Sequence, residues 1–201
     1  MKKFVRHEIS RRGLLLSGAA AAGVSFFTGE LLAQGELPPT PACGAEGAPT
    51  LAQTEGPYFT PKSPERQSLA EPGMKGRVLE LTGLVLTRSC KPVVRALVDF
   101  WQADADGAYD NRGFRLRGHQ FTDGEGRYRL RTIVPARYSF RTAHIHVKVQ
   151  AASRPVLTTQ LYFPDERGNA PDPIFRPELV MRMARAGEAH AGRFDFVLDM
   201  A

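Results

Sequence analysis

Short runs of apolar or alternating residues recur along the chain from about residue 78 onward. Turn residues such as Asp123-Gly124-Glu125-Gly126 separate them. Strands of this length, spaced by turn signals, are typical of two packed antiparallel sheets. The pattern therefore predicts an all-β domain, an antiparallel β-sandwich of the immunoglobulin or transthyretin type with little helix. The runs cover residues 78–86, 96–102, 126–132, 144–149, 156–163 and 193–198.

One segment has a helical rather than an alternating pattern. Between residues 177 and 189, Leu179, Met183 and Ala186 recur at steps of four and three. This spacing places the three side chains on one face of a helix. We therefore expect a single helix over residues 177–189.

The first 33 residues have the composition of an export signal. A basic start containing Arg11-Arg12 precedes an apolar stretch from Leu14 to Phe27, and Ala33 is a small residue suited to cleavage. This is the pattern of a twin-arginine signal. The apolar stretch falls short of the roughly 20 residues that cross a bilayer, so we expect removal of the signal rather than a stable membrane anchor.

The remaining chain divides into a lead-in and one domain. Residues 34–50 are rich in Pro and Gly and have no period, which predicts an extended lead-in to a single folded domain over 51–201. The signal predicts a periplasmic or extracellular protein. Because the twin-arginine route exports folded chains, it also favours a protein that acquires a metal before export.

The charge of the chain argues against a nucleic-acid partner. Five basic and two acidic residues of the signal contribute +3 of the formal net charge of +6. No basic stripe interleaved with aromatic residues remains in the body. We therefore expect no nucleic-acid partner.

Two cysteines, Cys43 and Cys90, follow the predicted signal. In an oxidising compartment paired thiols tend to form disulfides, so we expect a Cys43–Cys90 disulfide. Two isolated thiols are the alternative that the sequence leaves open.

The segment Ala143-His144-Ile145-His146-Val147-Lys148-Val149 alternates strictly. Both histidines then lie on one face of a strand, where two imidazoles can converge on one ion. A solvated strand face is an equally good interpretation of His-x-His alone. Tyr138 precedes the pair, and Tyr109 follows an earlier strand. Since tyrosinate is a hard anionic donor, two tyrosines with two histidines point to iron(III).

Three segments of the sequence resemble motifs of a known family. Phe100-Trp101-Gln102-Ala103-Asp104 through Tyr109, the segment from Tyr138 through Arg141-Thr142-Ala143-His144-Ile145-His146, and Thr159-Gln160-Leu161-Tyr162-Phe163-Pro164 are similar to motifs of the intradiol ring-cleavage dioxygenases. These are the protocatechuate and catechol dioxygenases. The resemblance covers about residues 54–164.

The resemblance implies one Fe(3+) per chain, held by Tyr109, Tyr138, His144 and His146. Tyr109 would be the retained tyrosine and Tyr138 the one displaced by substrate. It further implies that Arg141 and Gln160 are catalytic and, from Thr54-Glu55-Gly56-Pro57-Tyr58-Phe59, that Pro57 and Tyr58 contact substrate. His119 is expected to pack or to support the site rather than bind the metal.

The implied reaction uses O2 to cleave a catechol-type ring between its two hydroxylated carbons, which gives a muconate-type dicarboxylate. Only five residues separate Tyr138 from His144, fewer than in the larger members, so the loops that set substrate choice differ. Subunit assembly is not predicted.

Two other functions fit parts of the sequence. A secreted β-sandwich binding module would use Trp101 and the tyrosines to stack on a ligand. A zinc hydrolase would need a third ordinary ligand beside His144 and His146, and only His119 could offer it.

Overall fold

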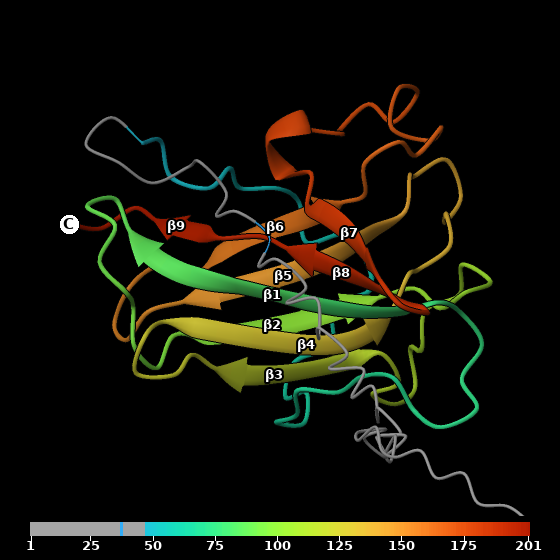
Figure 1. The fold of residues 1–201 in the computed structure, drawn as a ribbon, viewed down its shortest axis with the longest axis horizontal. Helices are drawn as coiled ribbons and strands as arrows, with labels where there is room; N and C mark the ends of the chain where they lie inside the picture. The colour runs from blue at the N-terminus through green and yellow to red at the C-terminus, as the bar shows by residue number, and fades with distance from the viewer. Residues whose placement is uncertain (1–36, 38–46) are drawn as a thin grey trace, which may run out of the picture. The chain divides into compact units, whose positions relative to one another are not determined.

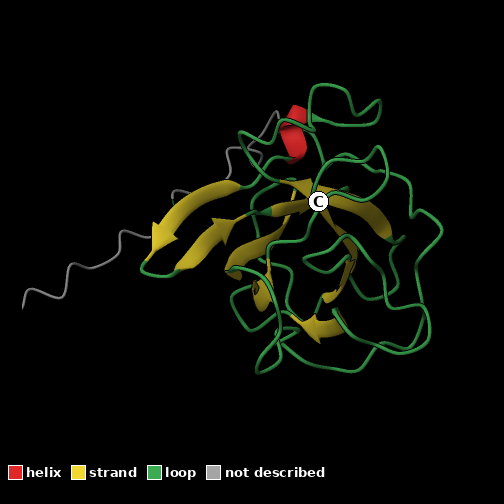
Figure 2. Ribbon diagram, turned by 90° about the vertical axis from the view of Figure 1, so that its right-hand side faces the viewer, coloured by secondary structure: helices red, strands yellow, loops and turns green. Residues whose placement is uncertain are grey.

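The computed structural model of the chain describes residue 37 and residues 47–201. The predicted signal, most of the lead-in and Cys43 lie outside the described residues. The described part is almost entirely strand and loop, and its one helical segment is a short 3-10 turn (Figure 2). Its elements are β1 (Val78–Thr87), β2 (Leu97–Gln102), β3 (Arg117–Phe121), β4 (Arg127–Ile133), β5 (His144–Gln150), β6 (Leu157–Tyr162), η1 (Pro177–Leu179), β7 (Arg182–Ala186), β8 (Ala189–Arg193) and β9 (Phe196–Leu198).

These strands form two sheets, which confirms the predicted β-sandwich. One sheet has the order β4-β1-β8-β7, with β9 also paired to β1, and the other has the order β3-β2-β5-β6. The axes of the long strands in both sheets lie nearly parallel, with arrows that point in either sense (Figure 1). The second sheet is antiparallel throughout, whereas β1 pairs with β8 and β9 in parallel.

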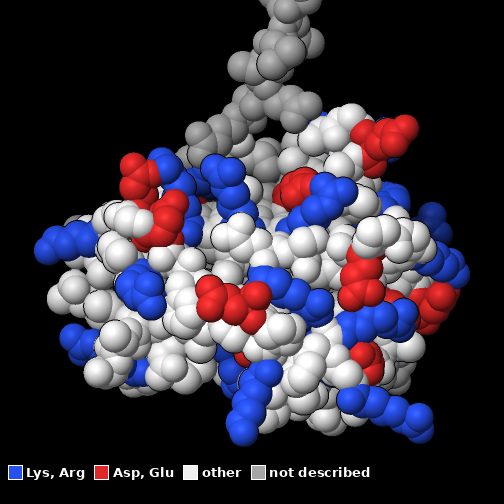
Figure 3. All heavy atoms as spheres, turned by 90° about the horizontal axis from the view of Figure 1, so that it is seen from below, with Lys and Arg blue, Asp and Glu red and all other residues white. Residues whose placement is uncertain are grey.

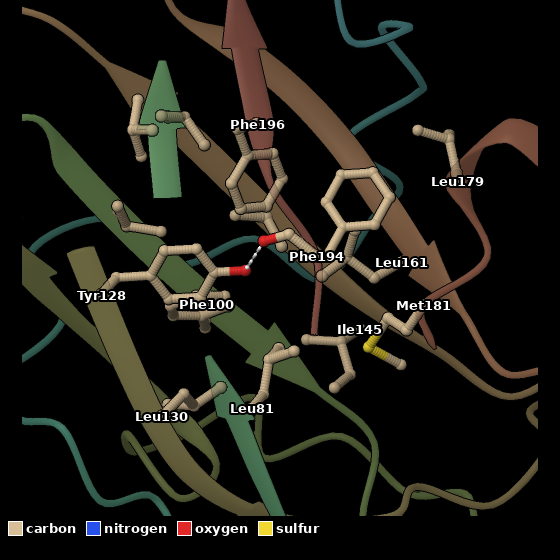
Figure 4. Close-up of a cluster of buried hydrophobic side chains, with 14 of the residues drawn as sticks. Leu81, Phe100, Tyr128, Leu130, Ile145, Leu161, Leu179, Met181, Phe194 and Phe196 are labelled. Carbon is tan, nitrogen blue, oxygen red and sulfur yellow. Dashed lines mark hydrogen bonds between the residues drawn. The ribbon is translucent and has the colours of Figure 1, made fainter. Parts of the chain in front are cut away.

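The core lies between the two sheets and is filled by alternate residues of their strands. Leu81 of β1, Phe100 of β2 and Ile145 of β5 are fully buried within it (Figure 4). Full burial of each such side chain contributes about 1.5–3 kcal/mol to stability. The Tyr128 hydroxyl donates to Phe194 O at 2.7 Å, so its one polar group is satisfied within the core.

The predicted helix over residues 177–189 is wrong. Only Pro177–Leu179 form a 3-10 turn, and β7 and β8 follow as a hairpin around Gly187, whose φ is +62°. A positive φ is natural for glycine and suits a tight hairpin turn. The helical spacing of three apolar residues is outweighed because β8 pairs with the long central strand β1.

Five of the six predicted runs each match one strand, with ends that differ by no more than one residue. The run over 193–198 spans the end of β8 and all of β9. Strand β3 was not predicted, because Arg117-Gly118-His119-Gln120-Phe121 contains a glycine and little apolar alternation. Backbone pairing with β2 stabilises β3 although its local sequence has little strand preference.

Charged side chains of both signs are interspersed on the face of the body shown in Figure 3. In the part of the chain that the structure describes, no helix is long and apolar enough to span a membrane.

Gly83 of β1 marks the closest approach of backbone within the sandwich. A Cβ placed there would lie 1.7 Å from Phe194 O and 2.8 Å from Tyr128 Cε1. Overpacking against backbone cannot relax by side-chain rotation, so Gly83→Ala should lower the free energy of unfolding by about 3 kcal/mol or more. Urea denaturation measures this change.

Gly124→Ala is the matched control, since nothing lies within 4 Å of a Cβ added there. It should change stability by no more than about 0.5 kcal/mol. Equal stability of the two variants would contradict the close packing of β1 at residue 83.

Candidate metal centre

The candidate site lies on the outer face of the β3-β2-β5-β6 sheet, opposite the core. The strand register aligns Arg117 of β3, Trp101 of β2, His146 of β5 and Gln160 of β6 in one row across the sheet. His144 stands in a second row, opposite Tyr162. The alternation of β5 therefore turns both histidines to this face, as predicted, while Ile145 and Val147 enter the core.

The two histidines converge at their Nε2 atoms, which lie 3.1 Å apart. His144 Nδ1 lies 2.6 Å from Thr142 O. Because a carbonyl can only accept, Nδ1 carries the hydrogen and Nε2 keeps its lone pair. The His146 ring stacks on Trp101 at 4.8 Å between centroids, which fixes its plane. Its Nδ1 is buried and has no hydrogen-bond partner among the described residues.

Tyr109 reaches the histidines from the loop after β2. Its hydroxyl lies 3.5 Å from His144 Nε2 and 3.2 Å from His146 Nε2. Asp104 shapes this loop, because its Oδ1 accepts the backbone N–H groups of Asp106 and Ala108, both at 2.9 Å. An aspartate that caps its own turn in this way holds the tyrosine at a fixed distance from the sheet.

Tyr138 lies beside Tyr109, with ring centroids 5.6 Å apart and planes at 88°. It sits at the start of a tight turn in which Arg141 N donates to Tyr138 O at 2.8 Å. The hydroxyls of Tyr58 and Tyr138 are hydrogen-bonded at 3.0 Å. The structure thus places Tyr138 at the site but pairs its hydroxyl with Tyr58 rather than with a histidine.

Arg141 and Gln160 are brought together behind the tyrosines. Arg141 Nη2 donates to Gln160 Oε1 at 2.5 Å and to the Tyr162 hydroxyl at 3.3 Å, and Nε donates to Asp172 Oδ2 at 2.8 Å. Asp172 also accepts the Thr142 N–H at 3.0 Å. Arg141 Nη1 has no hydrogen-bond partner among the described residues, so it can donate to a ligand.

The segment containing Pro57 and Tyr58 covers the row of site residues. Gln160 Nε2 donates to Thr54 O at 2.9 Å, which ties this segment to β6. Gly56 follows with φ +71°, and a Cβ there would lie 3.4 Å from His146 Cε1. The Tyr58 ring stacks on Tyr109 at 4.6 Å between centroids. Pro57 is exposed at the rim of this arrangement.

The donor set fits a first-row metal ion. Tyr109 Oη, His144 Nε2 and His146 Nε2 lie 3.1–3.5 Å from one another. Imidazole and oxygen ligands bind such ions at about 2.0–2.2 Å, and ligands around one ion then lie about 3 Å apart. Within the described residues, no group of three His, Cys, Asp or Glu side chains could hold a metal, so a metal bound by the two histidines would draw its further donors from the phenol oxygens.

Burial sets the protonation of these groups. It lowers the pKa of His144 to about 4 and that of His146 well below its usual value, so both imidazoles are neutral at neutral pH and have lone pairs available for a metal. Burial also raises the pKa of Tyr109 well above its ordinary value. The hydrogen bond with Tyr58 is the main cause of the raised pKa of Tyr138. A buried phenolate therefore needs a cation beside it.

Two predicted residues lie apart from this centre. Ser63 Oγ donates to Asp99 Oδ1 at 2.8 Å and lies 3.1 Å from His119 Nδ1, and the register places His119 opposite Asp99 of β2, consistent with a packing role. Cys90 is disulfide-bonded, and Cys43 lies outside the described residues, so the pairing of the two stays a prediction.

Some contributors to the site were not found from the sequence. Asp172 sits in an irregular loop, 31 residues from Arg141, and no local pattern connects them. Gln53 donates to Ile174 O at 2.8 Å and accepts from Tyr162 at 3.1 Å, which joins the N-terminal segment to the same loop. Such partners are visible only once the chain is folded.

Comparisons with known proteins show which family the chain belongs to. A family profile described as dioxygenase matches residues 54–200, which is more than half of the chain. The protocatechuate 3,4-dioxygenase beta chain of Burkholderia cepacia is 36% identical over 154 residues, covering 61% of this chain and 65% of that protein. The chain therefore spans a little less than two thirds of that relative's length.

Two solved structures are similar in both sequence and fold. The dioxygenase domain of a dioxygenase carbohydrate-binding protein fusion from Streptomyces sp. SirexAA-E is 56% identical with a TM-score of 0.75, and the match covers 77% of this chain and 100% of that chain. The 3-chlorocatechol 1,2-dioxygenase of Rhodococcus opacus 1CP is 30% identical with a TM-score of 0.71, covering 76% and 74%. The chain belongs to the intradiol ring-cleavage dioxygenase family that its motifs predicted.

Proposed function

We propose that this protein is an iron(III) dioxygenase that cleaves catechol-type rings between the two hydroxylated carbons and gives muconate-type dicarboxylates. The observation that carries the proposal is the convergence of Tyr109 Oη with the Nε2 atoms of His144 and His146, in a member of this family. Tyr138 supplies the fourth ligand. The substrate class is a catechol, because relatives are named for catechol, chlorocatechol and protocatechuate.

Two phenolates favour the trivalent state of iron, and the bound ion would make the ring of a chelated catechol reactive toward O2. The two neutral imidazoles add no charge, so the Tyr109 phenolate and a catecholate dianion together would balance a trivalent ion once Tyr138 has left as the neutral phenol. Binding of two histidines through Nε2 is consistent with the Nδ1 to Thr142 O contact of His144.

A catechol must lose two protons to bind as a dianion. Tyr138 Oη takes one of them when substrate displaces this side chain, and hydroxide from solvent takes the other and leaves as water. Tyr58 Oη, 3.0 Å from Tyr138 Oη, then forms a hydrogen bond with the neutral phenol and holds it aside. Tyr58 can therefore hydrogen-bond to Tyr138 both before and after Tyr138 accepts the proton as a general base.

Arg141 stabilises negative charge that develops on the ring oxygens. Asp172 and Gln160 occupy its Nε and Nη2, so the guanidinium plane is fixed and Nη1 faces no described protein acceptor. Burial alone would raise the pKa of Asp172, but the Thr142 N–H and Arg141 hold it below its ordinary value. The carboxylate is therefore a permanent anchor for Arg141.

The test of the proposal is product analysis. Iron-loaded protein given catechol under ¹⁸O₂ should release cis,cis-muconate with one labelled oxygen in each carboxylate. Cleavage beside the diol, or no product from any catechol, would contradict it. Stoichiometric ligand binding without turnover would favour the binding-module alternative instead.

We also propose that the protein is exported by the twin-arginine route, on the pattern of residues 1–33. The double variant Arg11→Lys, Arg12→Lys keeps the charge but removes the arginine pair, so the protein should stay inside the cell. Cell fractionation and N-terminal sequencing of the wild type, with a mature start after Ala33, measure this. Normal export of the double variant would refute the route, and Lys2→Gln serves as the control.

Replacing Tyr109 by Phe should remove the anionic donor nearest both histidines. Iron affinity should fall at least about tenfold and the visible tyrosinate-to-iron absorption should largely disappear. Iron analysis and an absorption spectrum measure both. Tyr128→Phe, which also removes a buried phenol, should keep iron and colour; equal iron in the two variants would exclude Tyr109 as a ligand.

Asp172→Asn should leave iron bound and lower kcat about a hundredfold, because the amide cannot hold the Arg141 guanidinium as a charged partner. Steady-state kinetics with catechol measure kcat, and iron analysis shows whether the variant retains its metal. Asp165→Asn, a nearby exposed aspartate of the same loop, is the control. Unchanged kcat in Asp172→Asn would show that Arg141 needs no carboxylate anchor.

A further inference from the structure

Arg117 is a buried charge that the proposed reaction does not use. Its residue is 1% exposed, and the register places it in the same cross-strand row as Trp101 and His146. Among the described residues, no carboxylate lies within ion-pair distance of its guanidinium. Burial of a charge without a counter-ion is costly, so its contacts need a specific reason.

Every hydrogen bond of the guanidinium goes to a neutral oxygen. Nη1 donates to Tyr58 O at 2.5 Å, Nε donates to Asp110 O at 2.9 Å, and Nη2 donates to Asn111 Oδ1 at 3.4 Å. The planar fork of arginine can bond several acceptors in fixed directions at once. It joins two segments that are 52 residues apart in sequence, since 110 − 58 = 52.

The joined segments carry two stacked rings of the candidate site. Tyr58 belongs to the segment that covers the site, and Asp110 directly follows Tyr109. The rings of Tyr58 and Tyr109 stack with centroids 4.6 Å apart and planes at 21°. Arg117 therefore bonds the backbone on both sides of this stack.

The base of this arrangement is itself held in place. Arg117 O accepts two bonds from Arg66, at 3.0 Å from Nε and 2.7 Å from Nη2. The neighbouring backbone is paired as well, since Arg66 N donates to His119 O at 2.8 Å. Strand β3 thus offers a fixed point to which the guanidinium ties the Tyr58 segment and the Tyr109 loop.

We propose that Arg117 is a positioning residue that clasps the Tyr58 segment to the Tyr109 loop and so sets the spacing of their rings. That spacing determines how a planar aromatic diol fits between the covering segment and the metal ligands. This role rests on the proposed function for the identity of the ligand. The clasp itself rests only on the contacts of Arg117.

Arg117→Lys separates the geometry from the charge, because lysine keeps the positive charge but cannot span both carbonyls. Hydrogen exchange of the iron-loaded protein should become at least tenfold faster in peptides covering residues 54–62 and 107–114 and stay unchanged in the other strands. The dissociation constant of 4-nitrocatechol, titrated by absorbance, should rise at least tenfold. Arg112→Lys, an exposed arginine of the same loop, should change neither.

An unchanged 4-nitrocatechol affinity, or faster exchange spread evenly over the sandwich, would overturn the proposal, because either result makes Arg117 an ordinary part of the fold. If Arg117→Lys does not fold, native-state hydrogen exchange of the wild type in low urea tests the role of Arg117 instead. The two segments should open with one common free energy, and independent opening would refute the clasp. A wild type that binds no 4-nitrocatechol would contradict the proposed function instead, and the exchange result would still judge the clasp.

Discussion

The register of β5 between β2 and β6 is the constraint on which the rest of the site depends. It sends Ile145, Val147 and Val149 into the core and turns His144 and His146 to the opposite face. A shift of one residue would exchange the two sets and remove both the core contacts and the histidine pair. The hydrophobic effect that stabilises the sandwich therefore also fixes the geometry of the two imidazoles.

Loops supply what a strand face cannot. The sheet presents neutral nitrogens, and the phenol oxygens arrive on the loops that carry Tyr109 and Tyr138. Hydrogen bonds of charged groups hold these loops, through the partly buried Asp104 beneath the first and through the buried Arg141–Asp172 pair beneath the second. Burial makes the charges of Arg141 and Asp172 costly when unpaired, so this pair restricts the second loop strongly. A rigid scaffold with functional loops is the result.

Local patterns in the sequence were enough for the sandwich, for most strands and for the alternation of His144 and His146. They failed where distant pairing decides the structure. The 177–189 segment has helical spacing, yet pairing of β8 with β1 makes it a hairpin, and β3 forms despite its glycine because β2 lies beside it. The partners of Arg141 and Arg117 could not be predicted either, because they come from segments that meet only in the fold.

Residue chemistry singled out two tyrosines beside the histidine pair, but the resemblance to a family was needed to add Arg141 and Gln160, since His-x-His alone fits a solvated strand face equally well. Their roles rest on one claim, that two tyrosines and two histidines hold iron(III). The most direct measurement is the iron content and visible spectrum of the purified protein, before and after anaerobic addition of catechol. The account predicts about one iron per chain, a red-brown tyrosinate-to-iron band and a shift to longer wavelength with catechol. A protein that stays colourless after iron loading would contradict it.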